Sequence, residues 1–483
     1  MRTHGHPSTW MRVLMCVAAI AMASVLSRAA IDSVRTDSGE VVAGPTSSGV
    51  TAFLGVPYAA PPVGNLRWRP PQPATYRNAD WKADQFSPSC IQSQPRSRLP
   101  WTEEFMAQGP ISENCLYLNV WTAAKNASAR LPVMVWIYGG GFTEGSSAIA
   151  VYDGSPLARK GVVVVTINYR VGPLGFLAHP ELTQESANRS SGNYGLLDQI
   201  AALRWVQRNI AGFGGDPAQV TIFGQSAGAI SVADLMRSPL SKGLFARAIA
   251  LSGPGLFGRN ALGGNATLQD REKAGLAYAQ AKGAPTLAEL RALPSTAFVP
   301  GSGAGAPTVP SSPVVDGWVL PADAPADQVP LMVGFVADDL GIGGTTPAEK
   351  AAARERARVS MHLWAADQAK ASKRVYTYFF DRAIPWPEHP EFGAFHSGEL
   401  PYVFNTLSRL KRPWQPVDQK LADTVSSYVT NFAKKSDPNA TGLPQWPAYD
   451  PAVYSTMQLG ESVGPMDLAS RERLSQLLED LKR

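Results

Sequence analysis

Short apolar runs rich in β-branched residues alternate with longer segments of helical periodicity along most of the chain. Residues 131–138 and 161–168 are almost continuously apolar and have the length of one strand, which is typical of strands buried on both faces of a parallel sheet. A helix is predicted over residues 197–210 and a further strand over 220–223. Strand, helix and strand in this order need right-handed crossovers, so the pattern predicts an α/β fold with a mostly parallel sheet flanked by helices.

The same alternation continues towards the C-terminus after one long interruption. Residues 258–312 are rich in alanine, glycine, proline and charged residues without a strong strand signal, so they are predicted to leave the sheet as helices and loops. Strands are predicted over residues 330–336 and 374–380, and an amphipathic helix over 469–482. The sequence contains no internal repeat and no interdomain linker, and a chain of this length can bury one deep core. Residues 30–483 are therefore predicted to form a single domain.

The first thirty residues differ from the rest. Two arginines precede an apolar run over residues 13–25, and small residues follow it, which is the order found in a secretory signal peptide. The run is shorter than the ~18 apolar residues that a membrane-spanning helix needs. Residues 1–29 are therefore predicted to be a signal peptide, cleaved after Ala23 or Ala29. The mature protein is expected to be secreted or periplasmic, with no stable membrane insertion.

The predicted export makes a disulfide between cysteines of the mature protein possible. The chain has three, and Cys16 lies in the predicted signal peptide, so the mature protein keeps Cys90 and Cys115 in a compartment where disulfides persist. A disulfide between these two residues is the prediction, and two separately buried thiols are the alternative.

The overall charge and the metal-binding residue types exclude other classes of function. The net charge is +5, from 44 basic and 39 acidic residues, and no basic block is interleaved with aromatic residues. Nucleic acid is therefore not an expected partner. No cluster of cysteines and histidines has the spacing of metal ligands, so no metal site is predicted.

The sequence Gly224-Gln225-Ser226-Ala227-Gly228 directly follows one of the predicted strands. This G-x-S-x-G pattern between a strand and a helix is typical of a nucleophile elbow. The turn is so sharp that side chains two positions before and after the serine must be minimal. It would expose the Ser226 hydroxyl and leave the Ala227 N–H at a helix N-terminus, facing developing negative charge. The pattern is short enough to occur by chance, so its weight depends on the surrounding motifs.

A second motif, Tyr138-Gly139-Gly140-Gly141-Phe142, stands at the end of another predicted strand. Consecutive glycines let backbone N–H groups approach a tetrahedral oxyanion without a Cβ in the way. Gly140 and Gly141 are the predicted donors and, with Ala227, would form an oxyanion hole. A flexible turn or a phosphate cradle is the alternative, but neither G-x-x-x-x-G-K-[ST] nor G-x-G-x-x-G follows a strand here.

These motifs belong to a longer ordered series that covers nearly all of the predicted mature chain. The series includes residues 53–59 (FLGVPYA), 112–119 (SENCLYLN), 192–195 (GNYG) and 214–217 (GGDP). With these motifs the sequence resembles the type-B carboxylesterases, a family of α/β-hydrolases. The resemblance implies an α/β-hydrolase fold and a serine nucleophile that hydrolyses small-molecule carboxylic esters. It also implies a disulfide at the positions of Cys90 and Cys115.

A serine nucleophile needs a base that is oriented by an acid. His396 follows the last predicted strand, in a segment similar to the catalytic histidine region of the family, and His389 is the second choice. In the chain order of α/β-hydrolases the acid lies between the serine and the histidine. The resemblance aligns Asp339 with a position where the family usually has glutamate, and the neighbouring Asp338 remains the alternative.

Ser226, His396 and Asp339 together predict an exported serine carboxylesterase that works through an acyl-enzyme and needs no cofactor. The interval between Asp339 and His396 is shorter than the resemblance leads one to expect, which predicts a shortened helical lid region and a more open pocket. Two other functions remain compatible with these residues. One is a catalytically inactive binding protein on the same fold. The other is an acyltransferase, or an amide or carbamate hydrolase, with the same triad.

Overall fold

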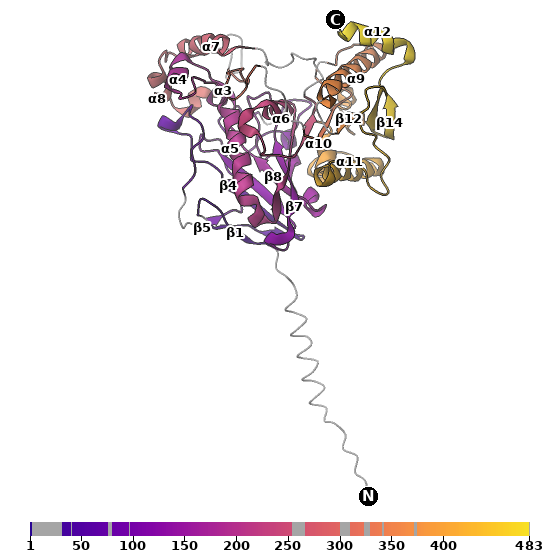
Figure 1. Cartoon of the computed structure of the whole chain (residues 1–483), viewed down its shortest axis with the longest axis horizontal. Helices are drawn as coiled ribbons and strands as arrows, with labels where there is room; N and C mark the ends of the chain where they lie inside the picture. Colours follow the sequence, from indigo (N-terminus) through magenta and orange to yellow (C-terminus); the bar gives the residue numbers. More distant parts are fainter. Residues whose placement is uncertain are drawn as a thin grey trace.

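A computed structural model gives the architecture of the chain (Figure 1). It describes residues 1, 31–39, 41–75, 80–95, 97–253, 266–299, 310–322, 329–340, 342–370 and 374–482. The predicted signal peptide lies outside these ranges apart from Met1, so signal cleavage and export stay predictions. In the described ranges, none of the helices combines the length and apolarity needed to cross a membrane.

A sheet of eleven strands forms the centre of the described chain, in the order β14-β13-β12-β11-β10-β9-β7-β8-β6-β4-β3. Its strands are β3 (Thr46–Ser47), β4 (Val50–Pro57), β6 (Tyr117–Thr122), β7 (Leu131–Ile137), β8 (Val163–Ile167), β9 (Gly215–Gln225), β10 (Arg247–Leu251), β11 (Leu331–Val336), β12 (Val375–Phe380), β13 (Ser455–Leu459) and β14 (Val463–Asp467). The neighbours from β13 to β8 pair in parallel. Antiparallel pairs add β14 at one end and β6, β4 and β3 at the other. The mostly parallel sheet is therefore confirmed, and both of its ends are antiparallel.

Burial explains why the central strands appear in the sequence as continuous apolar runs. Every residue of β8, β11 and β12 is buried, as expected for parallel strands covered on both faces. β9 begins at Gly215, before the predicted strand 220–223. Its first five residues (GDPAQ) form no apolar run, so the sequence does not indicate this part of the strand. A separate small sheet joins β1 (Ser33–Arg35), β2 (Val41–Ala43) and β5 (Asp80–Lys82).

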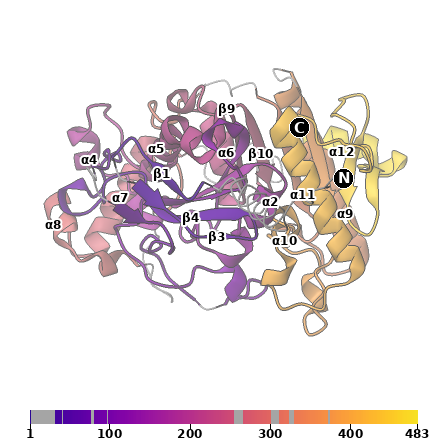
Figure 2. The ribbon, with the colours of Figure 1, turned by 90° about the horizontal axis from the view of Figure 1, so that it is seen from below.

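Helices pack on this sheet at several places (Figure 2). The α-helices of the described residues are α2 (Ser155–Arg159), α3 (Gly172–Phe176), α4 (Pro180–Glu185), α5 (Tyr194–Asn209), α6 (Ala227–Arg237), α7 (Leu268–Ala281), α8 (Leu287–Ala292), α9 (Pro347–Ala369), α10 (Leu400–Val403), α11 (Pro416–Lys435) and α12 (Arg471–Lys482). α5 and α6 contact β9, α2 contacts β8, and α11 contacts β7 and β9. This large mixed sheet with flanking helices is the predicted α/β-hydrolase fold.

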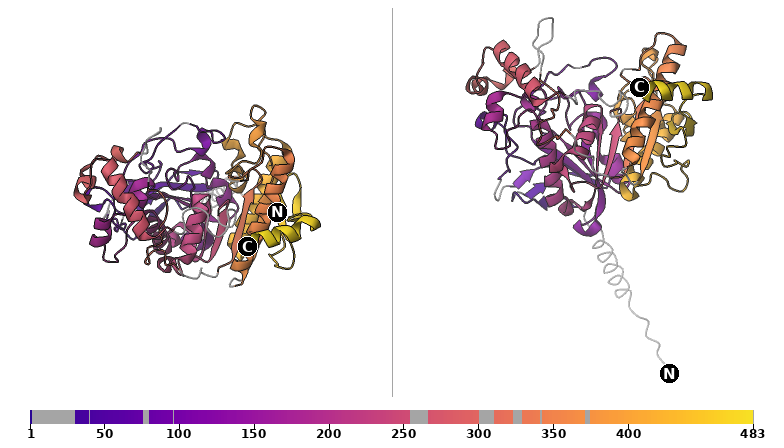
Figure 3. Two further views of the ribbon diagram at one scale, coloured as in Figure 1. Left: turned by 90° about the horizontal axis from the view of Figure 1, so that it is seen from above. Right: turned by 45° about the horizontal axis from the view of Figure 1, so that its top comes forward.

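The C-terminal third of the chain lies along one edge of the sheet, where both views of Figure 3 show it in orange to yellow. There α9 packs on β12 and on α12. α7 and α8 lie at the opposite side of the molecule (Figure 1). No strand occurs in residues 266–299, which agrees with the predicted helical excursion for the part of 258–312 that is described. The boundaries of α5 and α12 lie within three residues of the predicted helices.

An aromatic cluster packs around the end of β9, next to the turn between β9 and α6. The ring of Trp136, from β7, lies 4.8 Å from that of Phe223 and 5.0 Å from that of Phe404, centroid to centroid. Tyr152 completes the cluster at 4.9 Å from Trp136. All four side chains are buried, and offset aromatic pairs of this kind add stability beyond their buried area. The strand that leads into the turn is therefore densely packed.

Candidate active site

Ser226 stands at the sharp turn between β9 and α6. Its backbone has φ +56° and ψ −123°, a conformation that costs a non-glycine residue about 1–3 kcal/mol and persists where the surroundings enforce it. A Cβ on Gly224 would lie 2.5 Å from the carbonyl carbon of Gly228, and a Cβ on Gly228 would lie 2.0 Å from the carbonyl oxygen of Ile137. These clashes are the steric reason for the two glycines of the motif. The strand-turn-helix geometry expected of an elbow is thus present.

The predicted base and acid lie together. His396 Nδ1 is 2.5 Å from Asp339 Oδ1, and both side chains are buried. Asp339 lies just beyond β11, where its carboxylate also accepts hydrogen bonds from the backbone N–H groups of Leu340 (2.8 Å) and Val336 (3.3 Å). These bonds fix the carboxylate, so aspartate reaches the imidazole although it is one methylene shorter than glutamate.

Asp338 faces a different partner. Its carboxylate is 2.5 Å from Arg354 of α9 and accepts a hydrogen bond from the backbone N–H of Ala394 at 2.9 Å. It therefore ties the loop that carries His396 to the end of β11, and its oxygens are turned away from the imidazole. His389, the alternative base, pairs instead with Glu391 at 3.0 Å.

The glycine loop follows β7 and faces the elbow. Gly140 has φ +110° and Gly141 has φ +62°, which favour glycine. A Cβ on Gly140 would lie 2.2 Å from the carbonyl oxygen of Glu144. The backbone N–H groups of Gly140 and Gly141 donate to no partner within the described part of the chain. The N–H of Ala227 opens α6, where helix geometry offers it no acceptor.

These residues surround one cavity of about 710 Å³. Ser226, His396, Ala227 and the three glycines of the loop all line it, whereas Asp339 lies behind His396. The remaining walls include apolar side chains (Phe105, Met106, Phe142, Ile149, Ile230, Leu340, Leu400) and polar ones (Gln92, Gln94, Arg98, Thr143, Glu144, Ser312). Among the described residues, α9 contributes nothing to this lining. Helix α9 therefore lies away from the cavity, whereas Leu340, directly after Asp339, lines it.

Gln225 is a site residue that the sequence does not single out. Its side-chain Nε2 lies 3.0 Å from His396 Nε2, the ring nitrogen that faces away from Asp339. Within the described ranges, no hydrogen bond joins Ser226 Oγ to His396. The structure thus brings the predicted base and acid into contact, and it places Ser226 in the same cavity, with Gln225 at the ring nitrogen of His396 that faces away from Asp339.

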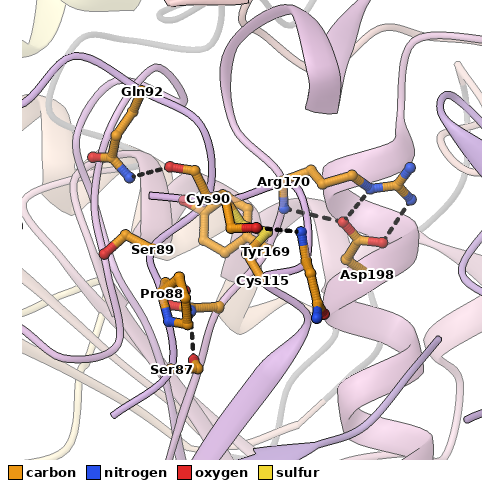
Figure 4. Close-up of a disulfide and its surroundings, with 12 residues drawn as sticks. Ser87, Pro88, Ser89, Cys90, Gln92, Cys115, Tyr169, Arg170 and Asp198 are labelled. Atoms are coloured by element: carbon orange, nitrogen blue, oxygen red, sulfur yellow. Dashed lines mark hydrogen bonds and ion pairs between the residues drawn. A yellow bond between two sulfur atoms is a disulfide. The ribbon is translucent and has the colours of Figure 1, made fainter. Parts of the chain in front are cut away.

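The disulfide between Cys90 and Cys115 is present, which confirms the predicted pairing. Figure 4 shows it below Gln92 and close to the buried ion pair of Arg170 and Asp198, whose side-chain atoms approach to 2.7 Å. The loop that the disulfide closes contacts both the segment after β7 and the loop that carries His396. The side-chain amide of Gln92 exchanges two hydrogen bonds with the backbone of Gly145 (2.7 and 2.8 Å).

Trp101, on the same disulfide-closed loop, contacts the loop that carries His396. Its indole N–H donates to the carbonyl oxygen of His396 at 3.0 Å. The loop therefore contacts Gly145, three residues after the glycine motif, through Gln92 and the loop that carries His396 through Trp101. Motif spacing gives no signal for these contacts, because both join segments far apart in the sequence.

With this geometry in place, comparison with known proteins gives the family. The Carboxylesterase family model matches residues 32–362 and 356–476. The chain belongs to this carboxylesterase family.

Its relatives in the family carry the names of esterases. A fumonisin B1 esterase of Sphingopyxis macrogoltabida is 37% identical over 95% of this chain and 94% of its own length. A para-nitrobenzyl esterase of Bacillus subtilis (strain 168) is 34% identical over 89% of this chain and 95% of its own. A human cocaine esterase is 33% identical over 86% of this chain and 85% of its own length. The protein is a carboxylic ester hydrolase, and the alternative of an inactive binding protein loses its support.

One further ionisable group of this carboxylesterase lies close to Asp339 and His396. Glu399 is fully buried, and its Oε1 accepts a hydrogen bond from Ser252 Oγ at 3.1 Å. Oε2 has no hydrogen-bond partner in the described part of the chain. Burial, reinforced by the nearby charge of Asp339, raises the pKa of Glu399 from 4.5 to about 7, while His396 partly opposes this shift.

This raised pKa predicts that folding stability falls as the pH rises. The folded protein holds the Glu399 proton up to about pH 7, whereas the unfolded chain releases it near 4.5. The proton on Glu399 contributes fully to the free energy of unfolding below pH 4.5. This contribution of about 3 kcal/mol is lost as the pH rises through about 7. Urea unfolding of Glu399→Gln should therefore show an advantage over the wild type that grows between about pH 5 and about pH 8.

The control for this measurement is Glu289→Gln, because Glu289 is an exposed carboxyl whose pKa is lowered by hydrogen bonds from the backbone and side chain of Thr286. It titrates below this window and should leave the difference from wild type constant across it. An equally constant difference for Glu399→Gln would show that Glu399 is ionised in the folded protein throughout.

Proposed function

We propose that this carboxylesterase is an exported serine esterase in which Ser226 is the nucleophile, His396 the base and Asp339 the acid. The observation that carries the proposal is the His396–Asp339 hydrogen bond at the wall of the cavity into which Ser226 opens. A carboxylate bound to Nδ1 keeps the proton on that nitrogen and leaves Nε2 free to accept another. This is the arrangement that turns a serine hydroxyl, which is a weak nucleophile, into a useful one.

The reaction follows from these roles. Ser226 Oγ attacks the ester carbonyl carbon while His396 Nε2 takes its proton, and the carbonyl oxygen becomes an oxyanion that accepts hydrogen bonds from the N–H groups of Gly140, Gly141 and Ala227. The carbon–oxygen bond to the alcohol then breaks, and His396 returns the proton to the departing oxygen. Water repeats the sequence on the acyl-enzyme, releasing the acid and restoring the serine. No step calls for a cofactor.

The proposed substrates are small-molecule carboxylic esters that the 710 Å³ cavity can hold. Three relatives are named for different organic compounds, namely fumonisin B1, cocaine and para-nitrobenzyl esters, which supports a cavity that accepts organic groups of moderate size. The apolar side chains suit an acyl chain or an aromatic alcohol. Cleavage of the N-terminal segment would deliver the enzyme to the periplasm or the medium, which fits the disulfide.

Covalent labelling tests the nucleophile directly. The mature protein is assayed against a chain-length series of p-nitrophenyl esters and then treated with an organophosphate, and the modified peptide is located by mass spectrometry. We expect turnover of the short esters, complete loss of activity on labelling, and the label on Ser226. Ser252 is the built-in control, because it also lines the cavity with a positive φ but donates its hydroxyl to Glu399.

Turnover with no label, or a label on Ser252, would contradict the proposed nucleophile. If the same acyl-enzyme formed but transferred its acyl group to an added alcohol faster than to water, the enzyme would be an acyltransferase. Amide and carbamate analogues in the same assay separate the remaining alternatives, because an esterase releases little product from them.

A further inference from the structure

The side chain of Gln225 occupies the position next to the base that a serine hydroxyl needs. Gln225 is the last residue of β9 and is 2% exposed. Its Nε2 lies 3.0 Å from His396 Nε2. Its Oε1 lies on the opposite side, 3.0 Å from where a Cβ of Gly139 would stand. The amide therefore lies between the glycine loop and the imidazole, with its Nε2 towards His396 and its Oε1 towards Gly139.

The direction of this hydrogen bond follows from the other side of the ring. An ionised Asp339 can only accept, so His396 Nδ1 carries a hydrogen and donates it. In the neutral imidazole Nε2 is then an acceptor, and the N–H of the Gln225 amide donates to it. A doubly protonated imidazolium would point its own N–H at that amide N–H, which is repulsive. With the amide in this orientation, Nε2 towards the ring, the contact is compatible with the neutral imidazole and incompatible with the imidazolium.

The same nitrogen has to receive the proton of Ser226 in the reaction. In the resting arrangement it is already occupied, and Ser226 Oγ has no hydrogen-bond partner among the described residues. The hydroxyl, or later the leaving alcohol, has to take the place of the amide N–H. Gln225 therefore competes with the nucleophile for the base while it keeps protons from solvent off the same atom.

We propose that Gln225 is a positioning residue that holds His396 in its neutral form with Nε2 covered, until Ser226 or the departing alcohol replaces the amide. The inference rests on the proposed function, since it assumes that His396 is the base. Its consequence is that the free enzyme keeps a usable base at a lower pH than the same triad without this donor.

Other charges face the imidazole from the elements packed around it. Asp339 bonds to it from the end of β11, and the buried Glu399 interacts with it from the start of α10. Arg98 and Glu144 line the same cavity as an ion pair with atoms 2.8 Å apart. All four groups are unchanged in variants of Gln225, so a difference between such variants reports on position 225 alone.

Two substitutions separate the possible roles of Gln225. Gln225→Met keeps the length of the side chain and removes the donor, and Gln225→Glu replaces the donor by a carboxylate that accepts a hydrogen bond from the imidazolium. The value of kcat/KM for p-nitrophenyl butyrate is measured against pH, because its acid limb reports groups of the free enzyme. We expect this limb to move to higher pH by about one unit in Gln225→Met, and further in Gln225→Glu.

The position of the limb does not depend on how much enzyme is folded, and the active-site concentration is obtained by organophosphate titration. Identical limbs in the wild type and both variants would overturn the inference and leave the triad intact. The same would hold for a limb that moved to lower pH in Gln225→Glu. A Ser226→Ala protein with wild-type turnover, assayed alongside, would instead overturn the proposed function.

Discussion

Replacing Ser226 by alanine is expected to lower kcat for p-nitrophenyl butyrate by about a million-fold, the loss seen when a serine hydrolase keeps its other groups but has no nucleophile. The remaining rate would come from the free N–H groups of the glycine loop and of Ala227, which polarise the ester without attacking it. The fold should survive, because Ser226 Oγ makes no hydrogen bond to a described residue that alanine would break. Initial rates of the purified variant against wild type give the ratio.

Ser252→Ala is the matched control for this measurement. Ser252 also lines the cavity, has φ +50° and directs its hydroxyl to Glu399. Its removal breaks one buried hydrogen bond, so the rate should change by no more than about tenfold. If the two variants lost activity to a similar extent, the elbow serine would not be the nucleophile.

Much of the fold can be predicted because the buried strands carry a signal in their own residues. β8 and β11 are buried at every position, and each appears in the sequence as one apolar run. β14 (VGPMD) contains glycine, proline and an acidic residue and is exposed or half-buried throughout, so nothing in its sequence indicates a strand. For this reason β8 and β11 are predictable from their own residues and β14 is not.

Some parts of the site can likewise be predicted from the sequence, and others cannot. The elbow and the glycine loop are predictable because their steric demands fall on glycines beside the functional residues. The contacts of Gln92, Trp101 and Gln225 join residues 53, 295 and 171 positions apart. Such distances are set by how separate loops pack, and no local pattern encodes them. The choice between Asp338 and Asp339 is of this second kind, because both residues follow the same strand.

The two aspartates should differ sharply when each is replaced by asparagine. Asp339 contacts His396 Nδ1 at 2.5 Å, so Asp339→Asn removes the charge that stabilises the imidazolium and allows the wrong tautomer of the ring. We expect kcat to fall by about 10,000-fold with little change in KM, because the defect lies in proton transfer. The measurement is a full kinetic comparison of the two single variants with wild type.

Asp338→Asn is the control because the new side chain keeps an oxygen that can accept the hydrogen bond from Ala394. It loses the charge of the ion pair with Arg354, which is partly exposed and therefore worth at most about 1 kcal/mol. Its kcat should stay within about tenfold of wild type, since its carboxylate acts on the position of the His396 loop and not on the ring. If Asp338→Asn were the more damaged variant, the acid in solution would be Asp338, and the loop after β11 would have to turn by one residue during the reaction.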